Sequence, residues 1–259
     1  ASITAHNDVI YRSPAHDGWE GVPLGNGRFG AQVWQPAGMM LQFNSALSGV
    51  YGGALARLRV YARPNMLDGM TSYRQRLRLH DATLESAIES TAGTLTSTAW
   101  IPASEDALVL TFHDEREEPR EWFVELEAWR GTARHNVDGT TIGISDHLEV
   151  KNEPDYRYAI VAETDVDAVK AEHYNPDTLR LRFTSSSFTL RLGMADTVES
   201  DADPRTEALQ ILSGIESRQQ RLRGAHEQWW ANFWSKSHIK LESPSGTADY
   251  IGNLWYMHI

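Results

Sequence analysis

The sequence predicts a mostly β protein: a large antiparallel β-sandwich of the supersandwich type, followed by a linker helix and a truncated C-terminal helix. Three observations favour this fold. Short alternating or β-branched segments recur as far as about residue 203, turn residues separate them, and almost no helical spacing occurs before that point. Several short strands with regular turns are typical of a β-sandwich.

The stretch around which the chain is organised lies near the N-terminus, where residues 19–31 read WEGVPLGNGRFGA. Gly25, Asn26 and Gly27 tolerate positive φ, and Asn-Gly is a strong turn signal. After this turn apolar and polar residues alternate as far as Trp34. We therefore expect a tight turn, with positive φ at its glycines, that leads into a half-buried strand.

The same turn matches the dinucleotide fingerprint G-x-G-x-x-G at residues 25–30. That fingerprint needs a strand before it and a helix after it, because the pyrophosphate binds at the helix N-terminus. Here a strand follows, then a turn at residues 35–38 and a second alternating run. The pattern therefore argues against a nucleotide site.

Composition excludes several classes of function. The formal net charge of −11 argues against nucleic acid and anionic membrane surfaces as partners, because phosphates are bound by clustered Lys and Arg. The chain has no cysteine, which excludes disulfides and thiolate metal sites. No apolar run approaches the roughly 20 residues that span a bilayer. The first residue, Ala1, is not Met, which suggests a mature or trimmed N-terminus.

Eight strands are expected between residues 80 and 195, on the basis of their alternation and of the turn residues between them. The charged residues 115–121 are expected to form an exposed hairpin tip. The eight expected strands are residues 83–89, 94–100, 107–112, 122–129, 141–144, 158–163, 178–183 and 188–194.

The pattern changes to helical at Asp203 and Pro204, which suit the N-cap and the first helical position. Apolar residues then recur at helical spacing as far as Trp234, and a short strand is expected at residues 238–241. A last amphipathic helix follows Ser243 and carries no C-terminal end signal, so we expect it to be the first helix of a helical barrel that is absent here. The predicted units are a β-sandwich at 1–203, a linker at 204–242 and the start of a barrel at 243–259.

No residue of the chain is predicted to be catalytic. Glycoside hydrolysis needs two carboxylates about 5–10 Å apart across a cleft. Glu125 and Glu127 share one strand face, as do Asp165 and Asp167, and solvated strand faces are the simpler interpretation of both pairs. The ten His show no H-E-x-x-H motif, and no Ser lies in a G-x-S-x-G context, so neither a metal nor any other cofactor is expected.

Residues 19–31, with a strand after them and then Asn44, resemble the opening of glycoside hydrolase family 95, which includes α-L-fucosidases. Residues 56–60 and 73–79 are similar to related sandwich domains of the same superfamily. Residues 226–234 resemble the linker that leads from the sandwich to the barrel in these enzymes. Residues 45–51 depart from the family, which shows an acidic residue, a Thr and a Trp there, so the resemblance is to the wider sandwich-plus-barrel superfamily.

This resemblance implies a non-catalytic N-terminal domain that packs on an (α/α) barrel and frames its active site. Catalytic acid and base would lie in the barrel, carbohydrate would bind through the barrel, and the protein would be periplasmic or extracellular in a bacterium. The sequence does not indicate an oligomeric state. The residues expected to frame substrate or contact the barrel are Trp19, Asn26, Arg28, Asn44 and Tyr51, and those expected to pack between domains are Trp230, Trp234 and Trp255.

Three points remain open here. The chain could be a stand-alone carbohydrate-binding module in which exposed aromatic residues such as Trp19, Trp34 or Tyr51 stack on sugar rings. The aromatic residues at 229, 230 and 234 could instead pack between the linker helix and the sandwich. Arg28 could either brace its own turn or face the barrel cleft, since its planar fork can hold several acceptors.

Overall fold

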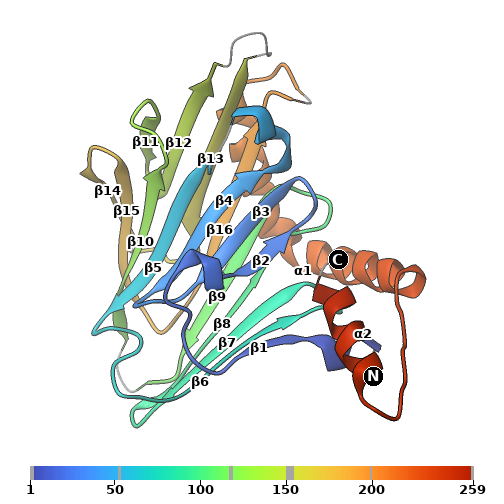
Figure 1. Ribbon diagram of the computed structural model, residues 1–259. Helices are drawn as coiled ribbons and strands as arrows, with labels where there is room; N and C mark the ends of the chain where they lie inside the picture. The colour runs from blue at the N-terminus through green and yellow to red at the C-terminus, as the bar shows by residue number, and fades with distance from the viewer. Residues whose placement is uncertain (1–2, 52–53, 117–118, 150–154, 199, 258–259) are drawn as a thin grey trace.

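The computed structural model describes residues 3–51, 54–116, 119–149, 155–198 and 200–257. In these residues the strands form two antiparallel sheets that pack face to face (Figure 1). The predicted mostly β sandwich is therefore confirmed, and so are its eight expected strands. No helix among the described residues is long and apolar enough to cross a membrane.

The nine-stranded sheet consists, in spatial order, of β1 (Val9–Tyr11), β6 (Met70–Arg78), β7 (Thr83–Ser90), β8 (Gly93–Trp100), β9 (Ala107–Asp114), β16 (Ser187–Asp196), β13 (Tyr156–Thr164), β12 (Thr141–Leu148) and β11 (Arg134–Asp138). The seven-stranded sheet consists of β14 (Lys170–Asn175), β15 (Thr178–Ser185), β10 (Arg120–Ala128), β5 (Ala56–Arg63), β4 (Met39–Ser45), β3 (Phe29–Trp34) and β2 (Val22–Gly25). The helices are the 3-10 helices η1 (Ile3–Asn7), η2 (Gly18–Glu20) and η3 (Ala46–Tyr51) and the α-helices α1 (Pro204–Lys236) and α2 (Thr247–Met257).

The main core lies between the two sheets, and strands such as β5 alternate between core and solvent. In β5 the apolar residues Leu58 and Val60 face the core, whereas Arg57 and Arg59 face outward. Aromatic rings fill the centre: Trp122 is fully buried and its Nε1 donates to the Ser185 carbonyl at 2.9 Å. Burial of this apolar area is the main stabilising term of the fold.

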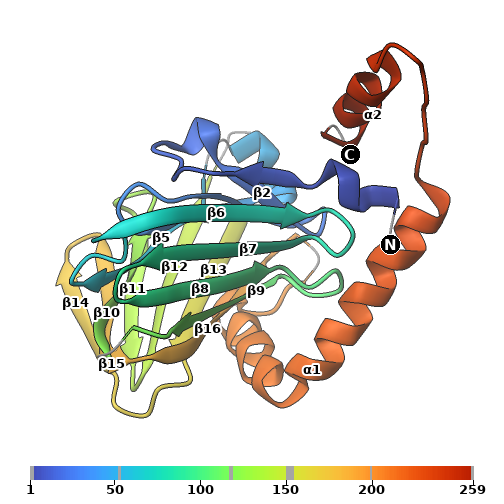
Figure 2. The same cartoon turned by 90° about the horizontal axis from the view of Figure 1, so that it is seen from below.

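Helix α1 covers the outer face of the nine-stranded sheet at β13 and β16 (Figures 1 and 2). Its buried residues Ala208 and Leu212 pack on Ala159 and Val161, and Ile215 packs on Val109. These strands are therefore buried on both faces, which explains why every residue of β16 after Ser187 is buried. The helix begins where predicted, because Asp203 accepts a hydrogen bond from the Thr206 amide at 2.9 Å.

Two local predictions are wrong. The hairpin tip expected at residues 115–121 is not formed, because β9 and β10 lie in different sheets; residues 117 and 118 of this segment lie outside the described residues. Within it Arg116 is buried: its Nη2 pairs with Asp114 Oδ2 at 2.5 Å and its Nη1 donates to the Met66 carbonyl at 3.0 Å. Residues 238–241 form no strand, because no sheet edge pairs with them. The three predicted domain units stay a prediction.

Candidate functional site

The β2–β3 turn fastens one sheet to the other through Asn26. The side-chain oxygen of Asn26 accepts from the backbone amides of Arg28 and Phe29, both at 2.9 Å. Its amide nitrogen donates to the Glu105 carbonyl at 3.1 Å and to Asp106 Oδ1 at 2.9 Å. Both acceptors lie in the β8–β9 connection of the other sheet. Asn26 therefore sets the turn conformation and clamps the two sheets at once.

The two glycines of this turn serve different purposes. Gly27 has φ +92°, as predicted, and a Cβ there would meet no atom within 4 Å. Gly25 does not have positive φ, so that prediction is wrong; it lies in β2, where a Cβ would come within 3.2 Å of the Phe29 carbonyl oxygen. Gly27 is thus needed for its backbone conformation and Gly25 for close approach of the paired strand.

Gly27→Ala should lower the free energy of unfolding by about 1 kcal/mol, because the new Cβ opposes positive φ while meeting no other atom. Denaturant unfolding followed by tryptophan fluorescence measures the change. Gly131→Ala is the matched control, since Gly131 also has open space around it but no positive φ, and it should be neutral or slightly stabilising. Equal effects of the two substitutions would show that backbone strain at Gly27 is unimportant.

Arg28 continues the contact from the turn to the β8–β9 connection. Its Nη2 lies 3.1 Å from Asp106 Oδ2, and 45% of its side chain is exposed. The neighbouring Glu105 accepts from Arg218 of α1, with Nη1–Oε1 at 2.6 Å and Nη2–Oε2 at 3.2 Å. These contacts favour Arg28 as a brace that connects the turn, through one loop, to the helix. A role toward a catalytic cleft stays a prediction.

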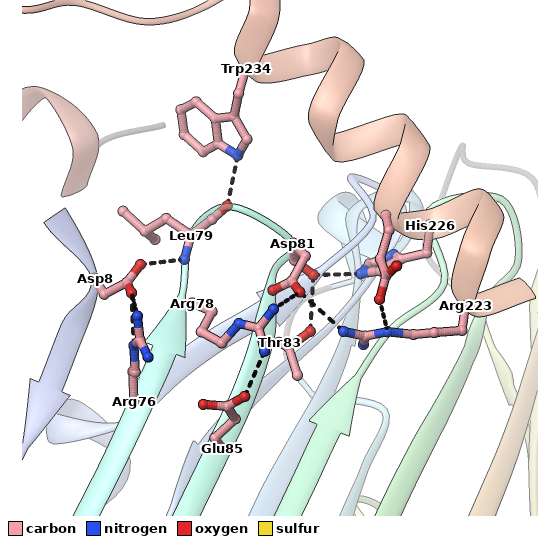
Figure 3. A network of polar contacts seen from close by, with 11 residues as sticks. Asp8, Arg76, Arg78, Leu79, Asp81, Thr83, Glu85, Arg223, His226 and Trp234 are labelled. Atoms are coloured by element: carbon pink, nitrogen blue, oxygen red, sulfur yellow. Dashed lines mark hydrogen bonds and ion pairs between the residues drawn. The ribbon is translucent and has the colours of Figure 1, made fainter. Parts of the chain in front are cut away.

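A second set of polar contacts joins the β6–β7 turn to α1 and centres on Asp81 (Figure 3). The carboxylate of Asp81 is 3% exposed, and its Oδ2 accepts from Arg78 and, at 3.1 Å, from Arg223 of α1. His226 Nε2 lies 2.7 Å from the Asp81 carbonyl oxygen, and Trp234 Nε1 donates to the Leu79 carbonyl at 2.7 Å. Contacts spread over about three turns of α1, from Arg223 to Trp234, therefore tie the helix to one β-turn.

The same β-turn also holds the N-terminal segment. Asp8 Oδ2 accepts from Arg76 Nε at 2.8 Å, and Asp8 Oδ1 accepts from the Leu79 amide at 2.9 Å (Figure 3). The Leu79 backbone thus donates to the N-terminal segment through its amide and accepts from α1 through its carbonyl. The N-terminus, the sheet and the linker helix meet at this turn.

His226 is neutral in this junction. Burial lowers the pKa of its imidazole below the ordinary value, and the nearby Arg223 guanidinium lowers it further, against the opposing effect of the hydrogen bond with the Asp81 carbonyl. Because the acceptor is a carbonyl, Nε2 must carry the proton in the neutral ring. The ring also lies 5.2 Å from the Trp100 ring, centroid to centroid. His226 therefore acts as a buried connector between helix and sheet.

An aromatic cluster, defined here as Trp229, Trp230, Phe233, Trp234, Trp255 and Tyr256, continues from this junction. Trp234 is buried, as expected for packing between helix and sandwich, and its ring lies 5.7 Å from that of Tyr256 in α2. Trp229 does not pack on the sandwich: it is 45% exposed and stacks on Phe233 at 5.7 Å. The interpretation of Trp229 as helix–sandwich packing is therefore wrong. The interdomain roles of Trp230, Trp234 and Trp255 stay predictions.

The α2 helix presents an apolar surface next to this cluster. Tyr250, Ile251 and Leu254 are exposed, which matches the apolar face expected of this segment. α2 lies against η1, and its Tyr256 contacts the ring of Trp234 in α1 and donates to the carbonyl of Ile239, in the connection after α1, at 2.9 Å. Apolar side chains gathered in this way are typical of an interaction surface.

The remaining predicted site residues do not gather in one place. Trp19 is 97% exposed in η2, where Asp17 caps the turn by accepting from the Trp19 amide at 2.9 Å. Asn44 is exposed in β4 and pairs with Gly30. The side chain of Tyr51 lies outside the described residues. Trp34 is buried, so the prediction that it is an exposed stacking platform is wrong; the η2 segment covers it, since a Cβ at Gly18 would lie 3.8 Å from its ring.

The carboxylate pairs offer no acid–base pair. Glu125 is not a solvated strand residue as predicted, because register brings Tyr61 and Arg180 beside it: its Oε1 accepts from Tyr61 at 2.8 Å and from Arg180 Nη2 at 2.6 Å. Asp165 accepts from the Thr189 amide at 2.7 Å and has a structural role. Among the described residues no group of three His, Asp or Glu could hold a metal ion.

His226 and Asp81, at the centre of the junction, were not among the predicted site residues. The sequence did carry a signal for His226: it follows Leu222 by four residues and precedes Trp230 by four, and this helical spacing predicts a position on the buried side of α1. Asp81 gave no such signal, because its partner Arg223 lies 142 residues further along the chain.

The family of the chain is established by residues 10–190, which match the model of DUF5703_N, described as a domain of unknown function, DUF5703. The chain belongs to this family. No curated protein matches the chain in sequence.

Solved structures of enzymes that act on carbohydrates share the fold of this DUF5703 chain. A protein described as a kojibiose phosphorylase from the human microbiome is 9% identical, with a TM-score of 0.66 over 96% of this chain and 41% of its own. A bacterial glucoamylase complexed with acarbose is 10% identical, with a TM-score of 0.51 over 96% of this chain and 43% of its own.

The GH92 family glycosyl hydrolase ccman5 is 12% identical to this chain, with a TM-score of 0.53 over 92% of this chain and 37% of its own. The chain thus spans about two fifths of the length of each of these structures. At these identities the likeness shows the fold alone. None of the three descriptions names family 95, so that more specific resemblance stays a prediction.

Proposed function

We propose that this chain is a non-catalytic domain of an enzyme that cleaves glycosidic bonds, and that it packs on and frames the active site of a helical (α/α) barrel. The observation that carries the proposal is the shared fold: more than nine tenths of the chain superposes on the kojibiose phosphorylase, on the glucoamylase and on the GH92 hydrolase. All three are described as enzymes of carbohydrate chemistry, and each is more than twice as long as this chain.

Two features of the structure support a role in framing rather than in chemistry. In both carboxylate pairs that the sequence suggested, one member is held by a structural contact: Glu125 by Arg180 and Asp165 by a backbone amide. The aromatic cluster and the exposed residues Tyr250, Ile251 and Leu254 of α2 offer an apolar surface of the kind that a neighbouring helical domain covers.

The more specific assignments remain proposals. Resemblance of residues 19–31 to family 95 makes an α-L-fucoside the first substrate to test, and the same resemblance favours export to the periplasm or the cell exterior. Arg28 and Trp19 would frame the cleft, and Trp230 and Trp255 would contact the barrel.

The purified 259-residue chain should turn over no glycoside. Aryl α- and β-glycosides, including the α-L-fucoside, are incubated with the chain with and without inorganic phosphate, so that both hydrolysis and phosphorolysis are measured. A chain extended into the proposed barrel is assayed in parallel and should cleave at least one of these substrates. Dose-dependent cleavage by the 259-residue chain, or no cleavage by the extended chain, would contradict the proposal.

A further inference from the structure

The outer face of the seven-stranded sheet carries rows of charged and aromatic side chains, and among the described residues no α-helix packs on it. Helix α1 packs on the other sheet and α2 lies against η1 (Figures 1 and 2). Register places Glu127 beside Arg57 and Glu125 beside Arg59 across β10 and β5.

A groove lies on this face with a cavity volume of about 440 Å³. This volume is in the range of small-molecule sites, roughly 300–1,000 Å³. One side of the groove is apolar and the other is formed by paired charges. Its lining residues are Trp34, Pro36, Ala37 and Met40 on the apolar side and Arg57, Arg59, Glu125, Glu127 and Thr178 on the polar side.

Neighbouring side chains hold Glu125 in place. Its Oε1 accepts from Tyr61 and from Arg180 Nη2, and 12% of its side chain is exposed. Burial and the hydrogen bond with Glu125 raise the pKa of the Tyr61 hydroxyl above its ordinary value, so Tyr61 remains a donor. The second carboxylate oxygen of Glu125 has a weaker contact, 3.9 Å from Arg59 Nη1. Glu125 is thus a fixed hydrogen-bond acceptor at the groove, and its second carboxylate oxygen can accept a further hydrogen bond from a ligand.

The two arginines of the groove are held by aromatic rings. The Arg57 guanidinium lies 5.2 Å from the Trp129 ring centroid, and that of Arg59 lies 4.5 Å from the Tyr61 centroid. Arg57 Nη1 contacts Glu127 Oε2 at 3.4 Å, while Arg57 Nε is buried without a hydrogen-bond acceptor among the described residues. Stacked guanidinium groups keep donors in fixed directions, so little entropy is lost when they bind.

We propose that this groove binds a short neutral oligosaccharide; the choice of carbohydrate rests on the proposed function. Two arginines and two glutamates make the groove neutral and give fixed donors and acceptors, which a pair of neighbouring sugar hydroxyls can satisfy together. On the apolar side Pro36, Ala37 and Met40 are partly exposed and can pack against the C–H face of a sugar ring, while Trp34 lies buried beside them. An anionic ligand would be repelled by Glu125 and Glu127, and a cationic ligand would be repelled by Arg57 and Arg59, so a neutral ligand fits best.

Binding of neutral oligosaccharides to the purified chain tests this site. Gluco-, manno-, galacto- and xylo-oligosaccharides of two to six units, with both α- and β-linkages, are titrated by calorimetry. At least one should bind, and Arg59→Ala and Glu127→Ala should each weaken its binding about tenfold or more, which corresponds to about 1.4 kcal/mol. Unchanged melting temperatures would show that these variants are folded.

Arg182→Ala is the matched control. Arg182 is an exposed arginine on the same face that pairs with Glu121 and does not line the groove, so its loss should leave affinity unchanged. The proposal is overturned if no oligosaccharide binds up to about 10 mM, if only acidic oligosaccharides bind, or if the two groove variants bind as tightly as the unmodified chain. These results differ from failure of the proposed function, which is judged by cleavage and not by binding.

Discussion

Asp81→Ala should lower the free energy of unfolding by about 3 kcal/mol. We expect most of this loss to come from detachment of the C-terminal part of α1 from the β6–β7 turn. The Asp81 carboxylate is 3% exposed and accepts from both Arg78 and Arg223. Its removal leaves two guanidinium groups side by side in a partly desolvated site. Denaturant unfolding gives the total change, and hydrogen exchange at residues 219–236 shows whether α1 loses protection locally.

Glu85→Ala is the control for this prediction. Glu85 also accepts from Arg78, at 2.7 Å, but about a third of its side chain is exposed, so we expect a loss of less than about 1 kcal/mol. Asp81→Asn, which keeps the shape and removes the charge, should fall between the two. If Asp81→Ala and Glu85→Ala have equal effects, the carboxylate of Asp81 does not hold the helix to the sheet.

The sequence predicts those strands in which apolar residues alternate with polar ones and face the common core. β15, with Leu179, Leu181 and Phe183 inward and Arg180 and Arg182 outward, follows this pattern. The edge strands β11 and β14 were missed because they lie at the ends of their sheets and bury little apolar surface: most residues of β14 are exposed. An edge strand is specified by the partner that it pairs with, and its own sequence carries a weak signal.

The candidate sites were harder to predict than the fold. Burial of Glu125 depends on the register of three strands, which brings Tyr61 from 64 residues earlier and Arg180 from 55 residues later. Alternation along one strand shows that Glu125 faces outward, but it does not show what covers it. Asn26 could be named from the sequence because its turn signal is local. Its acceptors in the β8–β9 connection could be identified only from the structure.

Gly193→Ala should lower the free energy of unfolding by about 2 kcal/mol, and Gly193→Val by more, within the range measured for overpacked interiors. Gly193 lies in β16 directly under α1, and a Cβ there would be 2.5 Å from the Ala208 carbonyl oxygen and 3.2 Å from the Leu212 amide nitrogen. Both obstacles are helix backbone, which cannot rotate away as a side chain can. The substitution must therefore lift α1 from the sheet and open the packing of Leu212 on Val161.

Gly143→Ala separates this effect from a general cost of adding a methyl group to the sheet. A Cβ at Gly143 would meet Val161 Cγ1 at 2.9 Å, the end of a side chain, and its nearest backbone atom is the Ile160 carbonyl oxygen at 3.3 Å. We expect a loss of about 1 kcal/mol or less there, because a side chain can shift where a helix backbone cannot. Thermal unfolding and hydrogen exchange of α1 compare the two variants, and equal losses at both positions would mean that the close approach of α1 to β16 is not required. If α1 does carry the chain toward a catalytic barrel, Gly193→Ala should also lower kcat/KM of the extended enzyme at temperatures where it remains folded, whereas Gly143→Ala should not.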